Sequence, residues 1–530
     1  MSPRTIVWLA FLPLIASAAA AAEKRPNIFI AISDDQSFPH ASVYGSKFVQ
    51  TPAFDRVARE GVLFTQAMCA SPGCSPSRAA LLTGQNTWQL EHAGTHASYF
   101  DPKFTTYPEQ LAKAGYFVGS CGKGWGPGDF RKLGRAHNPA GPSYRAGKQA
   151  KQKGYVGAFE QFLNERPAGK PFCFWFGSSD PHRGYKLGSG LAKGKKLSDV
   201  DVPSFLPDRE EIRSDLLDYA YEIERFDDDL ARMIALLEEA DELNNTLLIV
   251  TGDNGMPFPR AKANCYEYGI HVPLAICWTG QAPGKRVVED VVGFTDLTAT
   301  VYEAAGVEPG LAQEGKSLVG LLQSDRSGAV ESDRKAVFSA RERHSSSRYN
   351  SLSYPQRAIR TRDYLYIRNF KPERWPAGPA QKYDKAAYSA AGQLVDGKLG
   401  PAHGAYHDID ACPSLSYLVN HRDEAEVNAF LELAVGKRPA EELFDIRADP
   451  GCLRNLAADP MFARLRNELS DQLMDYLRTT GDARVLGNGD VWESYPRVSS
   501  LRWFPVPDWA EQSPGDAVLP DWVQKRQPKK

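Results

Sequence analysis

Two pairs of candidate metal-binding residues follow closely after apolar runs of the sequence. Residues 27–32 (NIFIAI) and 246–251 (TLLIVT) are β-rich runs that predict strands, and each is followed within two residues by a pair of oxygen-bearing side chains. These pairs are Asp34 with Asp35, and Asp253 with Asn254. Three carboxylates and an amide form a hard, oxygen-only set that suits Ca²⁺ or Mg²⁺ rather than zinc. The alternative is that each pair only ends a strand, because Asp and Asn favour turns.

A second group of reactive side chains lies in residues 74–78 (CSPSR). A helix is expected over residues 77–82, after a turn at Pro76. Cys74 could be an ordinary thiol, half of a disulfide with Cys69 as the near partner, or the precursor of a modified residue. Spacing alone leaves these alternatives open.

The order C-x-P-S-R at residues 74–78 resembles the motif in which type I sulfatases, members of the alkaline-phosphatase superfamily, have a cysteine oxidised to formylglycine. Residues 79–84 (AALLTG) are close to the family's usual continuation, and the resemblance extends over nearly the whole mature length. The other matches are to its metal ligands, its active-site lysines and its C-terminal signature: Asp34, Asp35, Asp253, Asn254, Lys123, Lys262 and residues 442–456. The resemblance implies an enzyme that hydrolyses sulfate from a sulfated carbohydrate.

Three further segments look like the sulfamidase branch of that family, the heparan N-sulfatases (N-sulfoglucosamine sulfohydrolases). They are residues 180–183 (DPHR), 253–259 (DNGMPFP) and 354–357 (YPQR), the last followed by an expected strand at 364–369. The resemblance implies hydrolysis of the N-sulfate of a terminal glucosamine in heparan sulfate or heparin. An O-sulfatase on another sulfated glycan is one alternative. A phosphonate monoester or phosphodiester hydrolase would instead release phosphate in preference to sulfate, and a non-catalytic glycan-binding protein would bind without turnover.

The resemblance also implies what becomes of Cys74. An aldehyde at this position would hydrate to a geminal diol, one oxygen of which attacks sulfur. The second hydroxyl would then lose its proton, so that the aldehyde reforms and sulfate leaves. A thiol could not perform this last step, so we interpret the cysteine as the substrate of a formylglycine-generating maturation enzyme. One Ca²⁺ ion is the expected cofactor, with Mg²⁺ as the alternative, held by Asp34, Asp35, Cys74, Asp253 and Asn254.

Positive side chains should surround the sulfuryl group, because negative charge spreads over its oxygens in the transition state. Arg78, one helical turn beyond Cys74, is expected to pair with the diol and the metal carboxylates, while Lys123 and Lys262 hold sulfate oxygens. His182 is the expected proton donor to the leaving group, since histidine titrates near neutral pH. A structural histidine is the alternative.

Trp125 stands where the family usually has a histidine that helps to manage the diol's proton, which leaves the base for the elimination step open. It could be a platform for sugar stacking or a core residue. Other polar and aromatic positions are candidates for contact with the substrate, and arginine suits bidentate recognition of a uronic acid carboxylate. The candidate substrate-binding residues are Trp88, Glu91, His92, His96, Trp125, Arg183, Arg341, Glu342 and His344.

Expected strands and helices alternate over residues 27–305, which predicts an α/β fold with a mostly parallel central sheet covered by helices on both faces. The family resemblance implies that this fold is alkaline-phosphatase-like. Ligands of such sheets bind beyond the carboxyl ends of the strands. Residues 62–68 are expected as one strand and residues 216–240 as a long helix. From about residue 378 loops dominate, with a helix at 463–477, which predicts a smaller C-terminal α+β subdomain. The expected division is a signal peptide (1–22), a catalytic domain (23–377) and a C-terminal subdomain with a tail (378–530).

The N-terminus is typical of a secretory signal peptide, with a positive charge at Arg4, an apolar run at residues 6–15 and small residues up to Ala22. We therefore expect export, and the single N-x-S/T sequon, at Asn244, favours a bacterial periplasm or secretion over a eukaryotic lysosome. No later stretch is long and apolar enough for a membrane span. The net charge of −2, from 63 basic and 65 acidic residues, argues against a nucleic-acid binder. The oligomeric state is left open.

Overall fold

The structure is a computed structural model that describes residues 25–148, 151–348, 351–378 and 406–499. The predicted signal peptide and the tail after residue 500 lie outside these residues. Among the residues described, no helix has both the length and the apolar character that a bilayer crossing needs.

A seven-stranded sheet forms the centre of the molecule, with the strand order β4-β5-β1-β6-β7-β2-β8. The four strands from β4 to β6 run parallel, β7 is antiparallel to both of its neighbours, and β8 is parallel to β2. The predicted mostly parallel sheet is confirmed. The strands are β1 (Asn27–Ser33), β2 (Val62–Phe64), β4 (Phe117–Gly122), β5 (Phe172–Gly177), β6 (Thr246–Gly252), β7 (Leu274–Cys277) and β8 (Arg286–Val288).

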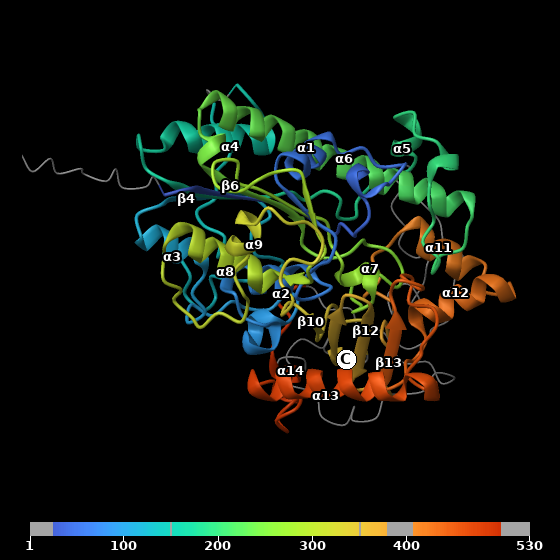
Figure 1. Ribbon diagram of the computed structural model, residues 1–530. Coiled ribbons are helices and arrows are strands. Elements are labelled where there is room, and N and C mark those ends of the chain that lie inside the picture. The colour runs from blue at the N-terminus through green and yellow to red at the C-terminus, as the bar shows by residue number, and fades with distance from the viewer. Residues whose placement is uncertain (1–24, 149–150, 349–350, 379–405, 500–530) are drawn as a thin grey trace, which may run out of the picture.

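Helices cover both faces of this sheet, as the alternation of elements predicts (Figure 1). Successive side chains of β1 point to opposite faces, so that Phe29 packs in the core on one side and Ile30 in the core on the other. The first core is shared with α1 (Pro52–Glu60), α4 (Gly154–Glu165) and α6 (Glu210–Glu239). The second is shared with α2 (Cys74–Thr83), α3 (Tyr107–Lys113), α8 (Phe294–Ala305) and α9 (Val319–Gln323).

Three local expectations differ from the structure. The long helix expected at residues 216–240 begins earlier, as α6 (Glu210–Glu239). Residues 62–68 do not form one strand, because the chain leaves the main sheet after β2, and β3 (Ala67–Met68) pairs with β9 (Val292–Gly293) in a separate two-stranded sheet. The helix expected from residue 77 begins at Cys74 instead, with Pro76 in its first turn. Proline is tolerated there because the first N–H groups of a helix have no partner within the helix.

A four-stranded antiparallel sheet, β10-β11-β12-β13, forms the smaller α+β part of the molecule. The helix α13 (Ala463–Thr479) packs Leu469 and Leu473 onto one face, while Leu365 on the other face joins the core of the main sheet. Three of the four strands precede residue 378, and the predicted domain division at that residue stays a prediction. The strands are β10 (Ala336–Arg341), β11 (Gln356–Thr361), β12 (Tyr364–Asn369) and β13 (Glu441–Asp445). The remaining α-helices are α5 (Ser189–Ala192), α7 (Glu267–Ile270), α11 (Pro413–Asn420), α12 (Ala425–Val435) and α14 (Val491–Ser494).

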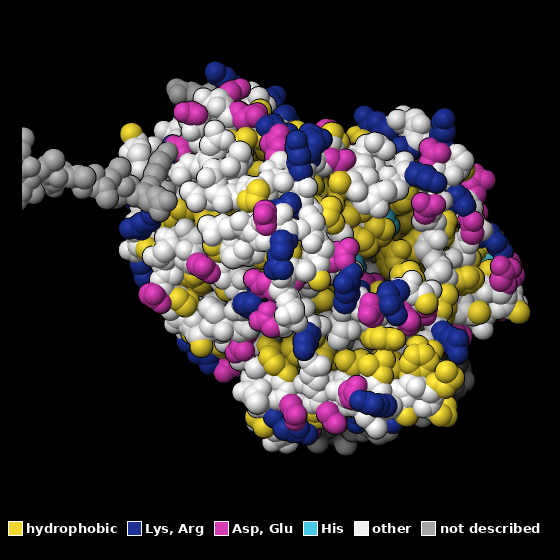
Figure 2. Space-filling model, in the orientation of Figure 1, with side chains coloured by type: hydrophobic (Ala, Val, Ile, Leu, Met, Phe, Trp, Pro, Cys, Tyr) yellow, Lys and Arg dark blue, Asp and Glu magenta, His cyan; other side chains and the backbone are white. Residues whose placement is uncertain are grey.

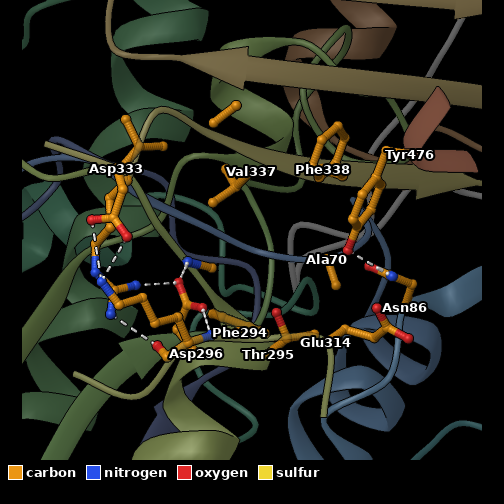
Figure 3. A pocket seen from close by; sticks show the side chains of 15 residues that line it. Ala70, Asn86, Phe294, Thr295, Asp296, Glu314, Asp333, Val337, Phe338 and Tyr476 are labelled. Carbon is orange, nitrogen blue, oxygen red and sulfur yellow. Dashed lines mark hydrogen bonds and ion pairs between the residues drawn. The ribbon is translucent and has the colours of Figure 1, made fainter. Parts of the chain in front are cut away.

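A cavity of about 240 Å³ lies where β10 and α13 meet the N-terminal end of α8 (Figure 3). On one side Phe338 and Tyr476 stack with ring centroids 3.7 Å apart, and Asn86 donates a hydrogen bond to the Tyr476 hydroxyl at 2.9 Å. On the other side Arg334 lies 3.3 Å from Asp296. The contacts of Asn86 with Tyr476 and of Arg334 with Asp296 join the smaller sheet to the rest of the molecule.

Candidate active site

Four neighbouring strands of the main sheet bring the predicted chemical residues together. Because β4, β5, β1 and β6 are parallel neighbours, their carboxyl ends meet at one edge of the sheet. Figure 2 shows a hollow in the region of α7, with Lys or Arg and Asp or Glu side chains around it. The residues that follow these strand ends are Lys123 after β4, His182 after β5, Asp34 and Asp35 after β1, and Asp253 and Asn254 after β6.

Three buried carboxylates and a thiol form the centre of this edge. Oxygen atoms of Asp34, Asp35 and Asp253 and the sulfur of Cys74 all lie within 4.8 Å of one another. Asp35 has a φ of 74°, in the left-handed region that residues other than glycine rarely adopt, and its N–H donates to Asp253 Oδ1 at 2.9 Å. Such backbone conformations cluster at functional sites. The two strand ends are thereby locked to each other.

The donor set of this cluster fits a hard divalent cation. Asn254 donates its amide N–H to Asp35 Oδ1 at 2.8 Å, while its own Oδ1 is buried and accepts no hydrogen bond from the described part of the chain. A buried carbonyl oxygen without a donor is costly unless a ligand satisfies it. Burial raises the pKa of Asp253 to about 6, against the attraction of Arg78. A cation would satisfy the Asn254 oxygen and stabilise these carboxylates together.

Arg78 and Lys123 form ion pairs with these carboxylates. Arg78 Nε lies 2.7 Å from Asp253 Oδ2, and Lys123 Nζ lies 2.7 Å from Asp34 Oδ1. Burial favours the neutral form of Lys123, but Asp34 holds its pKa above the ordinary value. Burial would likewise raise the pKa of Asp34, but Lys123 and other nearby cations hold it below the ordinary value. Both groups are therefore charged at neutral pH.

Cys74 is the first residue of α2, and its sulfur lies 3.5 Å from Asp34 Oδ1 and 3.7 Å from Asp35 Oδ1. It forms no disulfide bond, with Cys69 or otherwise. Burial raises the pKa of the Cys74 thiol well above its ordinary value despite the nearby lysines. The thiolate is the reactive form of cysteine, so the unmodified side chain is a poor nucleophile here.

His182 lies at the solvent side of the cluster. Its Nε2 is 3.8 Å from Asp35 Oδ2, its Nδ1 is 3.1 Å from the backbone oxygen of Arg183, and its side chain is 37% exposed. Nε2 therefore faces the carboxylates from the open side, where a leaving group would depart. This placement agrees with the predicted proton donor, which stays a prediction.

Lys262 joins the cluster from the loop between β6 and α7, and brings in a residue that the sequence analysis missed. Its ammonium donates to Asp35 Oδ2 at 2.6 Å and to Asp410 Oδ2 at 2.9 Å. Burial would raise the pKa of Asp410, but Lys262 and His182 hold it below the ordinary value. Asp410 belongs to an irregular segment just before α11 and follows no strand, so no periodicity or motif singles it out.

Two of the predicted substrate-binding residues lie beside the start of α2. The rings of His96 and His344 are 4.4 Å apart, and a Cβ atom added to Gly73, the residue before Cys74, would come within 3.2 Å of His344. Arg341 is buried next to this pair and donates to Asp408 Oδ2 at 2.7 Å. Arginine and histidine side chains thus lie near Cys74, and their role in substrate binding stays a prediction.

The other predicted substrate-binding side chains make their described contacts away from the acidic cluster. Trp88 donates to Thr480 Oγ1 at 3.0 Å, and Glu342 accepts from Arg357 at 2.8 Å. The remaining pairs are Glu91 with Lys103 at 2.7 Å, His92 with Ser98 at 3.4 Å, and Arg183 with Asp215 at 3.0 Å. Their role in substrate binding stays a prediction.

Trp125 is 3% exposed and packs edge-to-face on Phe100, with ring centroids 5.1 Å apart. Its face is therefore closed to a sugar in this conformation. Of the two interpretations offered by the sequence, the core residue is the one that the packing favours.

A family model described as Sulfatase matches residues 26–307, more than half of the chain. The protein belongs to the sulfatase family and is a hydrolase of sulfuric esters or sulfamates.

Comparison with individual proteins agrees with this assignment. The chain is 28% identical to the human N-sulphoglucosamine sulphohydrolase over 505 residues, which covers 88% of this chain and 93% of that protein. It is 26% identical to an ulvan-active sulfatase of Formosa agariphila over 471 residues, covering 88% and 82%. A solved structure of a protein in complex with its substrate D-glucosamine-2-N,6-O-disulfate superposes with a TM-score of 0.61 at 19% identity, covering 87% of this chain and 99% of the other. That likeness confirms the α/β sulfatase fold.

Proposed function

We propose that the protein hydrolyses the N-sulfate of a terminal glucosamine in heparan sulfate or heparin, using a formylglycine made from Cys74. The observation that carries the proposal is the placement of Cys74 at the start of α2, with its sulfur within 3.7 Å of the carboxylates of both Asp34 and Asp35. Similarity to the human N-sulphoglucosamine sulphohydrolase over 88% of the chain supports the choice of branch. Export through residues 1–22 and maturation by a formylglycine-generating enzyme are parts of the same proposal.

The metal site is proposed to take one Ca²⁺ ion, held by Asp34, Asp35, Asp253, Asn254 and the modified side chain at position 74. When bound, such an ion supplies positive charge that activates the nucleophile and polarises the sulfuryl oxygens. The oxygen-only donors favour Ca²⁺ or Mg²⁺ over zinc.

The chain's own cations do the rest of the binding. Arg78 is held by Asp253 and by the backbone oxygen of Lys123, to which it donates at 2.6 Å, so that its position is fixed before a substrate arrives. The ammonium groups of Lys123 and Lys262 would hold sulfate oxygens, where fixed charges stabilise the transition state without reorganisation. His182 Nε2 gives a proton to the departing amine.

The O-sulfatase alternative has its own support. The solved structure of similar fold holds a substrate that carries both a 2-N-sulfate and a 6-O-sulfate, so this likeness does not favour the N-sulfatase over the O-sulfatase. The metal ion and the ammonium groups of Lys123 and Lys262 would act on the sulfuryl group, whichever atom it is attached to.

Free sulfate released from two matched glucosamine substrates tests the proposal, one carrying only an N-sulfate and one only a 6-O-sulfate, with Cys74→Ala as the control. We expect release from the N-sulfated sugar, abolished in the control. Release from the 6-O-sulfated sugar alone would move the enzyme to the O-sulfatase alternative. A phosphonate monoester added to the panel tests the remaining enzymatic alternative, because faster release of the phosphonate would favour it.

A further inference from the structure

Asp410, which no sequence pattern singled out, lies in a short segment that is fixed at both ends. On its N-terminal side Asp408 is buried and accepts from Arg341 at 2.7 Å and from the Ser345 N–H at 2.7 Å, and it also pairs with Arg348. A buried carboxylate with several hydrogen-bond donors is held in one position, because moving it would leave buried charges without partners. The contacts of Asp408 therefore fix the N-terminal end of the segment.

The C-terminal side of the segment is tied to the main domain. Ser414, in the first turn of α11, donates its N–H at 3.1 Å and its hydroxyl at 2.6 Å to Asp215 Oδ2. Asp215 stands on α6 and also pairs with Arg183, whose second guanidinium nitrogen lies 3.0 Å away. Figure 1 shows α11 next to this region of α6. Arg183 and Arg341, both predicted to bind substrate, thus hold the segment that carries Asp410 from its two ends.

Asp410 itself has one carboxylate oxygen that is free to accept a hydrogen bond. Its Oδ2 accepts from Lys262, whereas its Oδ1 accepts no hydrogen bond from the described residues. Its side chain is 21% exposed, in contrast to the buried Asp34, Asp35 and Asp253. A carboxylate oxygen of Asp410 also lies within 4.8 Å of both His182 and Asp35. The carboxylate of Asp410 therefore lies at the exposed side of the acidic cluster, beside His182.

A fixed carboxylate at this position opposes the binding of the sulfate anion, because like charges repel more strongly in a partly buried site than in water. We therefore expect the carboxylate to make a favourable contact with another part of the substrate. An ionised carboxylate only accepts hydrogen bonds, and so recognises hydroxyl or N–H groups. A sugar ring carries such donors on the atoms next to a sulfated position.

We propose that Asp410 is a specificity-determining residue, which accepts a hydrogen bond from a hydroxyl or N–H of the sugar next to the sulfated position. This inference rests on the proposed function and names what the site requires beyond the sulfuryl group. It implies opposite effects of Asp410 on two ligands: it weakens the binding of bare sulfate and strengthens the binding of a sulfated sugar.

The test compares the two ligands on two variants that cannot turn over. Binding of inorganic sulfate, glucosamine N-sulfate and N-acetylglucosamine 6-sulfate is measured calorimetrically on the Ca²⁺-loaded Cys74→Ala protein, with and without Asp410→Asn. Asparagine keeps the size of the side chain, and retained sulfate binding shows that the site is folded. Asp475→Asn, at a 73% exposed position on α13, is the control for loss of one negative charge.

We expect Asp410→Asn to weaken binding of the sulfated sugar by about tenfold to a hundredfold, as for loss of a hydrogen bond to a charged group. Binding of inorganic sulfate should be unchanged or tighter, and Asp475→Asn should change neither. Equal weakening of both ligands, tighter binding of both, or unchanged binding of the sugar would each overturn the inference. If the protein with Asp410 binds only the 6-O-sulfated sugar, the N-sulfate proposal fails. The role of Asp410 is then tested with the 6-O-sulfated sugar. If it binds neither sugar, both fail.

Discussion

Arg78 and Asp253 form an ion pair that is closed to solvent on both sides, with Arg78 Nε 2.7 Å from Asp253 Oδ2 and both side chains 0% exposed. Arg78 stands on α2, one turn beyond Cys74, and Asp253 follows β6. The pair therefore holds the helix that begins with Cys74, the proposed nucleophile position, against the strand end that carries Asp253, a proposed metal ligand.

Removal of Arg78 should destabilise the fold as well as abolish activity. Arg78→Met leaves Asp253 buried without its partner, and we expect the free energy of unfolding in chelator to fall by about 3–5 kcal/mol. Urea denaturation measures this. Arg464→Met is the matched control, because Arg464 is 91% exposed and its pair with Glu468 should contribute at most about 0.5 kcal/mol. Equal losses in the two variants would show that the buried pair has no special role.

Calcium affinity should depend on pH through Asp253. Its raised pKa, about 6, means that the side chain is protonated below that pH and must lose a proton to bind the ion. We expect the association constant for Ca²⁺ to be flat above pH 7 and to fall about tenfold per pH unit below about 6, because one proton then competes with each ion. Calorimetric titrations at several pH values measure the slope. The Asp253→Asn variant should bind more weakly and lose this slope, and an affinity that stays constant between pH 7 and pH 5 would contradict the assignment.

Loss of His182 should matter in proportion to the leaving group's need for a proton. His182→Ala should lower kcat on the sulfated sugar by about 10²- to 10⁴-fold, the usual contribution of general acid catalysis. On an aryl sulfate, whose phenolate leaves without a proton, the loss should be much smaller. His421→Ala removes a half-exposed histidine that pairs with Glu424 and serves as the control. An equal loss on both substrates would argue for a binding or structural role.

Trp125 should contribute to stability rather than to sugar binding. Trp125→Ala removes a buried aromatic side chain and its contact with Phe100, and we expect the free energy of unfolding to fall by about 3–5 kcal/mol. Trp125→Phe keeps a ring at this position and should lose less. KM for the sugar substrate should change little in the phenylalanine variant. A stable alanine variant with a greatly raised KM would restore the stacking interpretation.

The parts of the site that were predictable from the sequence are those with a local signature. Asp34 and Asp253 follow apolar runs that predict strands, and strand order then brings both to one edge of the sheet. Asp410 has no such signature, because its place depends on contacts of Asp408 and Ser414 with distant parts of the chain. The burial of Trp125 depends in the same way on tertiary packing. The helix start at Cys74 was missed because Pro76 suggested a turn, although proline also fits the first turn of a helix.

Sulfate release measured together with the chemical state of residue 74 tests the central claim most directly. The protein is produced with and without a formylglycine-generating enzyme, and peptide mass gives the fraction of residue 74 that carries an aldehyde in place of the thiol. We expect the rate of sulfate release from a sulfated glucosamine to rise in proportion to that fraction and to vanish in Cys74→Ala. Release at an undiminished rate by protein whose residue 74 is entirely cysteine or alanine would contradict it.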